Sequence, residues 1–172
     1  KKYEKEDLNP RKAVDAAVAL LPGDRTGASG VLLATLTDNV GMPVLGKYFT
    51  TGRLRKNKLK KDVGELLRRF DVKPPVPGIE LRKLSGGNQQ KALLAKWIQI
   101  KPDVLLLHEP TQGVDVGSKA AIFEKITDAA RAGAGVIVAS AEHEDLANIC
   151  NRVLIFAEGK VVAELTGREL TP

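Results

Sequence analysis

The sequence predicts an α/β protein built around a parallel sheet, because its second half alternates between helical and strand-like periodicity. From residue 88 onward, helical segments and short apolar runs follow one another, an order typical of parallel sheets. A proline-rich stretch over residues 73–78 cannot continue a helix, and it separates this half from a mainly helical stretch over residues 31–70. An early apolar run at residues 18–21 supplies one further strand for the same sheet.

Local signals predict the elements of the first half. Asn9 is a suitable helix cap and Pro10 a suitable first helical residue, so a short helix is expected over residues 11–17. After the early strand, residues 26–30 are expected to form a flexible, glycine-bearing loop. Turns rich in glycine, proline and threonine interrupt the later helical stretch at residues 41–43 and 50–52.

The second half is predicted to contain three helices and four strands. The helices show apolar residues at helical spacing, and the strands are short runs rich in β-branched or leucine residues. Glu158 and Gly159 form a two-residue turn that returns the last strand as a hairpin, although such turns more often use Asn-Gly or Asp-Gly. The expected helices cover residues 88–99, 118–131 and 144–150, and the expected strands cover residues 104–107, 136–139, 153–156 and 161–165.

Composition limits the class of protein. The 172 residues suffice for one domain with a sizeable core, and 43% hydrophobic with 28% charged residues is typical of a soluble globular chain. No apolar run approaches the roughly 20 residues that cross a bilayer. The single cysteine, Cys150, excludes a disulfide within the chain and fits a reducing compartment. Because the chain begins Lys1-Lys2 and its only methionine is Met42, we expect it to be part of a longer protein.

The net charge of +6 permits an anionic partner, and basic residues are densest between residues 53 and 61. Apolar residues recur at helical spacing through the same region, which favours a helix with a solvated basic face. Nucleic-acid binding is the alternative, but such a surface usually adds aromatic side chains, and only Tyr48 and Phe49 lie nearby. The basic residues are Arg53, Arg55, Lys56, Lys58, Lys60 and Lys61, and the apolar ones are Leu59, Val63, Leu66, Leu67 and Phe70.

Two short motifs indicate phosphate chemistry. Ser85, Gly86 and Gly87 open an expected helix, where a bare backbone and unpaired N–H groups favour an anion. Farther along, the apolar strand at residues 104–107 is followed by Glu109, and a carboxylate at the tip of a buried strand can polarise a water molecule. Each motif alone also fits an ordinary helix cap or loop cap, so their order along the chain carries the interpretation.

In this order, residues 84–91 and 103–111 resemble the signature and Walker B motifs of ATP-binding-cassette (ABC) ATPases. The Asn-Gln-Gln-Lys continuation of the signature, together with residues 113–117, is similar to the sugar-importer branch (ribose or xylose type) of that family. Residues 22–25 are similar to the family's loop that contacts the transmembrane partner. The resemblance runs over residues 13–165, nearly the whole chain.

The resemblance implies a partial P-loop NTPase (RecA-like) core with parallel strands, formed by residues 1–34 and 101–172. Residues 35–100 would then be the helical subdomain that carries the signature motif. The complete protein would bind ATP and Mg²⁺ and hydrolyse ATP to drive carbohydrate uptake. Its partners would be a second nucleotide-binding domain and transmembrane permease subunits, not nucleic acid, and it would lie in the cytoplasm against the inner face of the membrane.

The resemblance also implies a role for each candidate residue. Glu109 corresponds to the catalytic glutamate that positions the attacking water. Asp115 corresponds to the D-loop aspartate that couples the two half-sites of a dimer. The nucleotide held by the opposite half of the dimer would be bound by the signature residues Ser85, Gly86, Gly87 and Gln89.

Three positions depart from the family pattern. His108 stands where an aspartate normally steadies Mg²⁺, and neutral imidazole brings no negative charge and suits softer metals, so this half-site is expected to be impaired. Ala141 occupies the switch position, usually histidine or serine, and His143 could replace it only if the register shifts. Gly23 replaces a glutamate. A metal site made of His108, Glu109 and His143 is a further alternative, although such a site needs more ligands.

No complete phosphate-binding loop of the form G-x-x-x-x-G-K-[ST] occurs in the sequence. The near match at residues 41–48 has Tyr48 in place of the small hydroxyl residue, and Pro43 removes one N–H donor. We interpret it as a chance match, so the chain alone is expected to be inactive as an ATPase. Two other functions stay open, a non-catalytic dimerisation and coupling module and a nucleic-acid-associated ABC protein.

Overall fold

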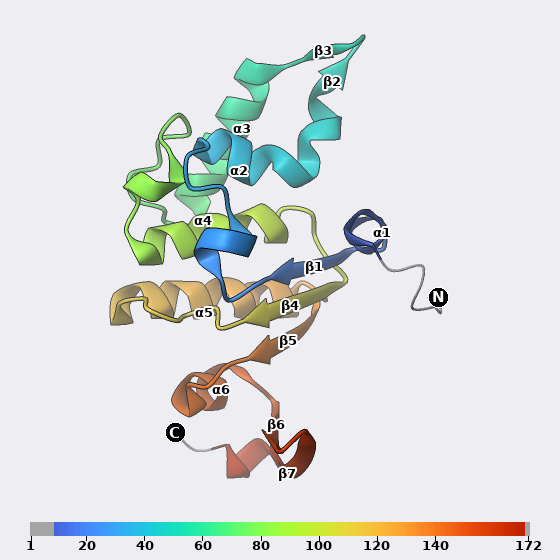
Figure 1. Cartoon of the computed structure of the whole chain (residues 1–172), viewed down its shortest axis with the longest axis vertical. Helices are drawn as coiled ribbons and strands as arrows, with labels where there is room; N and C mark the ends of the chain where they lie inside the picture. The colour runs from blue at the N-terminus through green and yellow to red at the C-terminus, as the bar shows by residue number, and fades with distance from the viewer. Residues whose placement is uncertain (1–8, 171–172) are drawn as a thin grey trace.

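The computed structural model describes residues 9–170 and arranges them in layers (Figure 1). A parallel sheet lies in the middle, helices from the first half lie on one side of it, and a C-terminal hairpin lies at the far end. The first helix, α1 (Pro10–Asp15), begins as predicted, since the Asn9 side chain accepts a hydrogen bond of 2.9 Å from the Lys12 N–H. The α/β class and the parallel sheet are confirmed.

The central sheet has three strands in the order β1 (Val18–Leu21), β4 (Val104–His108) and β5 (Gly135–Ala139). All neighbours are parallel, and the register places Leu21 beside Leu107 and His108 beside Ala139. The early strand therefore joins the sheet, as the sequence predicts. Because β4 is paired on both edges, its carboxyl end has a fixed position between the ends of β1 and β5.

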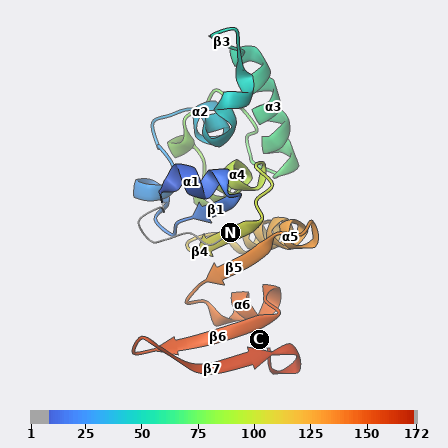
Figure 2. The same cartoon turned by 90° about the vertical axis from the view of Figure 1, so that its right-hand side faces the viewer.

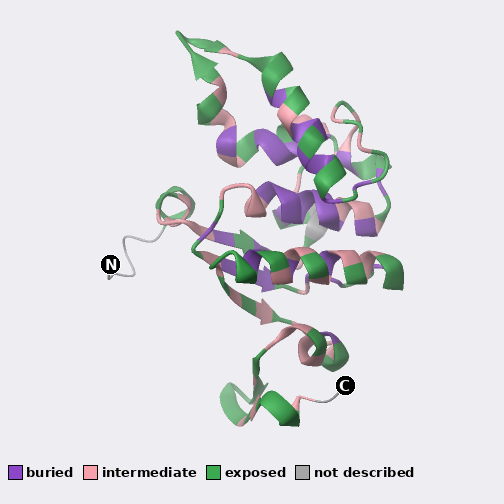
Figure 3. Cartoon of the chain, turned by 180° about the vertical axis from the view of Figure 1, so that it is seen from behind, coloured by how far each residue is buried: buried purple, intermediate pink, exposed green. Residues whose placement is uncertain are grey.

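Two long helices cover this sheet. Helix α4 (Gly86–Ile98) contacts β1, and α5 (Val116–Arg131) contacts β5 and α4. Apolar side chains from both helices and from the strands are fully buried between them, which stabilises the fold through removal of apolar surface from water. Figure 3 shows these buried positions concentrated in α4 and the adjoining helices and strands, whereas the C-terminal hairpin is mostly exposed. The fully buried residues include Leu93, Leu94, Leu105 and Ile122.

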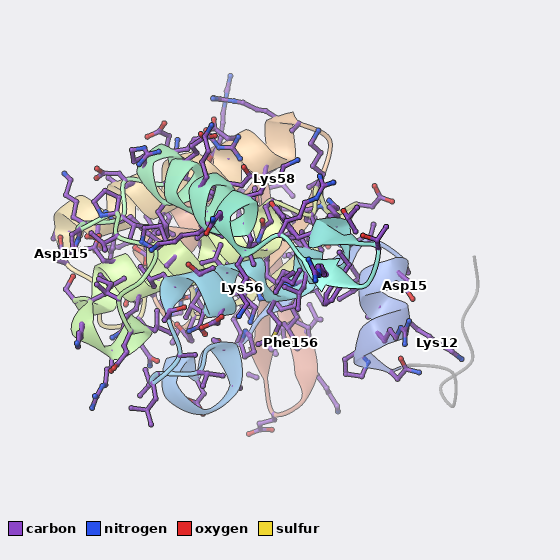
Figure 4. The ribbon with its side chains drawn as sticks, turned by 90° about the horizontal axis from the view of Figure 1, so that it is seen from above. Lys12, Asp15, Lys56, Lys58, Asp115 and Phe156 are labelled. Carbon is purple, nitrogen blue, oxygen red and sulfur yellow. The ribbon has the colours of Figure 1, made fainter. Side chains whose placement is uncertain are left out.

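The helical layer beyond α4 contains α2 (Leu36–Gly41), the 3₁₀ helix η3 (Met42–Tyr48) and α3 (Lys56–Arg69). Helix α3 buries its predicted apolar stripe, Leu59, Val63, Leu66 and Leu67, and Phe70 follows in the core. Its basic side chains are exposed, so the interpretation as a solvated basic face is confirmed. Lys56 and Lys58 are labelled on this helix in Figure 4.

One local expectation is wrong, and the turn predicted at residues 50–52 is confirmed. Residues 25–29 form a turn of π-helix, η2 (Arg25–Ser29), rather than a flexible loop, because the Asp24 carbonyl accepts from Ser29 N–H and its carboxylate accepts from Gly27 N–H. The turn expected at residues 50–52 closes a short hairpin, β2 (Phe49–Thr50) with β3 (Arg53–Leu54). The signature helix is preceded by the short 3₁₀ helix η4 (Leu81–Lys83).

The C-terminal part consists of α6 (His143–Ile149), β6 (Arg152–Ala157), β7 (Lys160–Thr166) and the 3₁₀ helix η5 (Gly167–Glu169). The predicted hairpin is confirmed, with positive φ at both turn residues, as a type I′ turn requires.

Strand β6 pairs only with β7 and does not extend the parallel sheet, contrary to the alternation seen in the sequence. A groove of about 1230 Å³ separates β5 from β6. The hairpin lies beyond β5 and α6 in Figure 2.

One buried cation stands out in this core. Lys96 of α4 is 7% exposed, and its ammonium donates to the Ser29 carbonyl at 3.2 Å and lies 5.0 Å from the centre of the Trp97 ring. No carboxylate of the described residues forms an ion pair with it. Burial away from water therefore lowers the pKa of Lys96.

This lowered pKa predicts a pH-dependent stability. Between the folded-state and unfolded-state pKa values of Lys96, the unfolded chain binds more protons, so the free energy of unfolding should rise with pH. We expect urea midpoints of the wild-type chain to increase from neutral pH toward about pH 10 relative to those of Lys96→Met. A constant difference between the two chains across this range would contradict the prediction.

Candidate functional site

Glu109 lies at the carboxyl end of β4, where the segment following β5 holds it. Its backbone N–H donates to the Ala139 carbonyl at 2.8 Å, and its backbone has φ of +49°, in the left-handed region that few non-glycine residues adopt. One carboxylate oxygen accepts from the Ser140 hydroxyl at 3.0 Å, and the other accepts from the Ala141 N–H at 2.8 Å. Both oxygens of the predicted catalytic residue are therefore anchored.

His108 precedes Glu109 as the last residue of β4 and is exposed. It lies against the turn that follows β1. A Cβ atom added to Gly23 would stand 3.2 Å from His108 Nδ1 and 3.3 Å from the His108 carbonyl oxygen, which is closer than most packed atoms. The two departures from the family pattern at positions 23 and 108 are therefore neighbours, and glycine leaves the room that the imidazole uses.

Ser85 occupies the N-cap position of α4, with Gly86 and Gly87 in its first turn. The Ser85 hydroxyl makes no capping bond to the helix, and instead accepts from the Asn88 side chain at 2.9 Å. The first N–H groups of an α-helix have no partner within the helix, so this end offers donors to an anion. The Gln89 side-chain amide donates to the Leu84 carbonyl, just before the helix, at 3.0 Å.

Gly87 lies in contact with the start of α5. A Cβ atom at position 87 would stand 2.6 Å from Ser118 Oγ and 3.1 Å from Asp115 Oδ2, so only glycine allows this approach. Asp115 caps α5 by accepting from the Ser118 N–H at 2.9 Å, and this hydrogen bond lowers the pKa of Asp115. Figure 4 shows Asp115 on the opposite side of the molecule from Lys12 and Asp15 of α1.

The predicted site residues thus form two groups. Ser85, Gly86, Gly87 and Asp115 gather where α4 and α5 begin, and His108 and Glu109 lie at the ends of the strands. Among residues 9–170, no hydrogen bond or ion pair joins one group to the other. Chemically, the first group presents N–H donors and the second a positioned carboxylate.

No protein-family model matches the chain. Among curated proteins, it is 40% identical over 163 residues to the "putative ribose/galactose/methyl galactoside import ATP-binding protein 1" of Rhizobium meliloti (strain 1021). It is 36% identical over 165 residues to the "ribose import ATP-binding protein RbsA" of Roseobacter denitrificans. Each match covers 95% of this chain and 32% of the relative, so the chain spans about a third of the length of these relatives.

Among solved structures, a dimeric ATP-binding cassette in a post-hydrolysis state, bound to ADP and Pi, matches with a TM-score of 0.77 at 20% identity. That match covers 95% of this chain and 70% of the cassette. The chain therefore has the fold of an ABC ATPase cassette and is similar in sequence to ATP-binding proteins of sugar importers. A further ABC structure, cbiO1 from Clostridium perfringens, matches with a TM-score of 0.70 at 19% identity and covers 95% of this chain and 61% of cbiO1.

The Asn-Gln-Gln-Lys continuation of the ABC signature has a structural role in this chain that the sequence did not reveal. Asn88 accepts from the Lys73 N–H at 2.7 Å, and the buried Lys91 donates to the Asp71 carbonyl at 2.7 Å. Both bonds fasten residues 71–73, where the proline-rich stretch begins, onto α4. Gln90 is also buried. These polar residues therefore fix the position of the signature helix within the helical layer.

Sequence reasoning missed the residues that surround Glu109 in this chain. Ser140 donates to Glu109, and a linked cluster of Thr111, Lys119, Glu142 and Asp145 lies directly behind it. The sequence held a signal for Ser140, because this residue directly follows the strand expected at residues 136–139. The carboxyl ends of parallel strands meet at one edge of the sheet, so Ser140 could have been expected near Glu109. The cluster joins three segments, the chain after β4, the first half of α5 and the start of α6, and left no such local signal.

The two alternatives weighed for this region are not built by the described residues. Residues 9–170 contain no group of three or more histidine, cysteine, aspartate or glutamate side chains placed to hold a metal, so His108, Glu109 and His143 do not form such a site. Residues 41–48 end α2 and continue as a 3₁₀ helix, not as a loop between a strand and a helix. The Tyr48 hydroxyl donates to Asp62, and burial together with this bond raises the pKa of Tyr48 to about 12.

The contact at Gly87 predicts a sensitive position. Gly87→Ala should lower the free energy of unfolding by about 1–3 kcal/mol, because the added methyl group overlaps Ser118 and must push α4 from α5. Gly117→Ala is the matched control, since its Cβ would meet nothing nearer than 3.5 Å. Urea unfolding of the two variants measures the difference, and combining Gly87→Ala with Ser118→Gly should recover part of the loss. Equal stability of the two single variants would contradict the prediction.

Proposed function

We propose that this chain is part of the ATP-hydrolysing subunit of an ABC importer for carbohydrates. The observation that carries the proposal is the anchored Glu109 carboxylate at the end of β4, in a chain whose signature helix packs through Gly87 onto Asp115. The similarity to ribose and galactoside import ATP-binding proteins supports the substrate class. These relatives are about three times as long as the chain, so the complete activity belongs to a longer assembly.

The start of α4 fits the phosphates of a nucleotide. It is the N-terminus of a helix of 13 residues, its cap residue Ser85 is exposed, and its first N–H groups are unpaired within the helix. We place Ser85, Gly86, Gly87, Gln89 and Asp115 against ATP held by a second cassette. A solved cassette with this fold is a dimer with ADP and Pi bound, which supports a paired arrangement.

Glu109 is the residue to which we assign catalysis. Phosphoryl transfer to water requires alignment of the water and placement of charge rather than covalent chemistry by the protein. A carboxylate with both oxygens anchored can accept a hydrogen bond from water in one fixed direction. Ser140 and Ala141 set that direction by holding the two oxygens.

The residues present fit Mg²⁺ poorly. Mg²⁺ prefers oxygen ligands in near-octahedral geometry, whereas the position beside Glu109 carries the imidazole of His108. We therefore assign no step to a metal held by His108, and propose that this half-site is impaired in metal binding and serves mainly to complete the opposite site.

The proposed partners are a second nucleotide-binding domain and the transmembrane permease subunits, with residues 22–25 facing the permease. No helix among the described residues has the length and apolar character to cross a membrane. We propose that the chain lies peripherally on the inner face of the cell membrane.

Two rival functions each have one observation in their favour. His108 favours a coupling module without catalysis, and the exposed basic face of α3 favours association with nucleic acid.

ATPase assays distinguish catalysis from coupling. In the longer importer protein that contains this segment, Glu109→Gln should lower the turnover contributed by this half-site on the order of 100-fold or more, because the amide cannot act as the anionic acceptor. The chain alone should show no turnover, since its sequence carries no complete phosphate loop. Unchanged turnover of the Glu109→Gln protein would favour the coupling module, and turnover by the chain alone would reopen the assignment of residues 41–48.

Replacing the imidazole tests the impaired half-site. His108→Asp in the longer protein should raise Mg²⁺-dependent turnover several-fold, because a carboxylate supplies the charge and the oxygen ligands that Mg²⁺ favours. His108→Asn is the control, since it adds an oxygen without the charge. Turnover and Mg²⁺ dependence that stay the same in both variants would contradict the proposal.

A further inference from the structure

The segment that grips Glu109 is itself ordered by a chain of hydrogen bonds. Ser140 donates to the Glu109 carboxylate at 3.0 Å, and the same hydroxyl oxygen accepts from the Glu142 N–H at 3.1 Å. Ala141, between them, donates to the second Glu109 oxygen at 2.8 Å. The position of Glu109 therefore depends on where residue 142 is held.

Lys119 of α5 holds that residue. Its ammonium forms an ion pair with the Glu142 carboxylate and a second ion pair, at 3.2 Å, with Asp145 of α6. These hydrogen bonds, that to Glu142 first, raise the pKa of Lys119, so it stays cationic over the physiological range. A single side chain thereby joins α5 to the N-cap residue and to the first turn of α6.

The same cluster also reaches the chain on the other side of Glu109. Asp145 is buried and accepts from the Thr111 hydroxyl at 2.6 Å, and Thr111 is fully buried two residues after Glu109. Lys119 is thus linked through Glu142 to the 140–142 segment that holds the Glu109 carboxylate, and through Asp145 to Thr111. Buried polar groups satisfied in this way resist displacement, because any opening leaves them unpaired.

We propose that Lys119 is a positioning residue for Glu109, acting through Glu142 and the 140–142 segment, and through Asp145 and Thr111. The inference rests on the proposed catalytic role of Glu109 for its functional meaning. Lys125, on the same helix, provides a natural comparison. It has the same 21% side-chain exposure and also pairs with two carboxylates, but both of these, Glu124 and Asp128, lie on its own helix.

Amide hydrogen exchange of the 172-residue chain, followed by NMR, tests the proposal. Lys119→Met should speed exchange at the Ala141 and Glu142 amides about tenfold or more, since both donate within the affected segment. Exchange at the Leu106 amide in the middle of β4 should change less than twofold. Lys119→Arg should restore slow exchange, and Lys125→Met should leave all three amides unchanged.

Two results would overturn the proposal. One is unchanged exchange at Ala141 and Glu142 in Lys119→Met, and the other is an equal acceleration at every amide, which would mean that Lys119 contributes only to global stability. If Lys119→Met does not fold, Glu142→Gln replaces it, and the same two amides must respond. Because exchange requires no nucleotide, a negative result here is distinct from a failure of the proposed ATPase function.

Discussion

The pairing of β4 on both of its edges is the constraint on which the rest of the structure depends. Parallel neighbours β1 and β5 fix its register, and Leu105 and Leu107 anchor it in the core. The chain therefore leaves the sheet at one defined point, with Glu109 bonded through its backbone to the end of β5. A left-handed backbone at a non-glycine residue persists only where its surroundings over-determine it, and here the surrounding hydrogen bonds supply that restraint.

The group formed by Ser85, Gly86, Gly87 and Asp115 depends on the close approach of the N-termini of α4 and α5. Gly87 lets α4 approach the cap of α5, so the donors of one helix and the capping carboxylate Asp115 of the other share one surface. Asn88 and Lys91 then fasten the preceding segment to α4. A few adjacent residues thus combine N–H donors that are unpaired within the helix with side-chain bonds that keep the helix in place. This explains why the motif is polar in sequence although much of it is buried.

Most of the fold could be predicted because its signals are local. The strands at residues 18–21 and 104–107 are apolar runs bounded by turn residues, and α1 and α5 begin at side chains that cap them. The candidate residues at the end of β4 and the start of α4 were found from two short motifs and their resemblance to the ABC family, which are local signals as well. The cluster around Lys119 was not predictable, since it depends on side chains brought together by tertiary packing. Tertiary packing also decides which strands pair. The periodicity of the sequence therefore predicted β6 in the parallel sheet, whereas in the structure it pairs only with β7.

The free edge of β5 has a practical consequence. Among the described residues, one edge of this strand has no partner, Ile137 on it is 61% exposed, and Phe156 across the groove is 67% exposed. An unpaired, apolar strand edge is a template for any extended chain, including another copy. The isolated chain is therefore prone to concentration-dependent aggregation through this edge, and a strand laid along β5 would suppress it by taking up the free N–H and carbonyl groups.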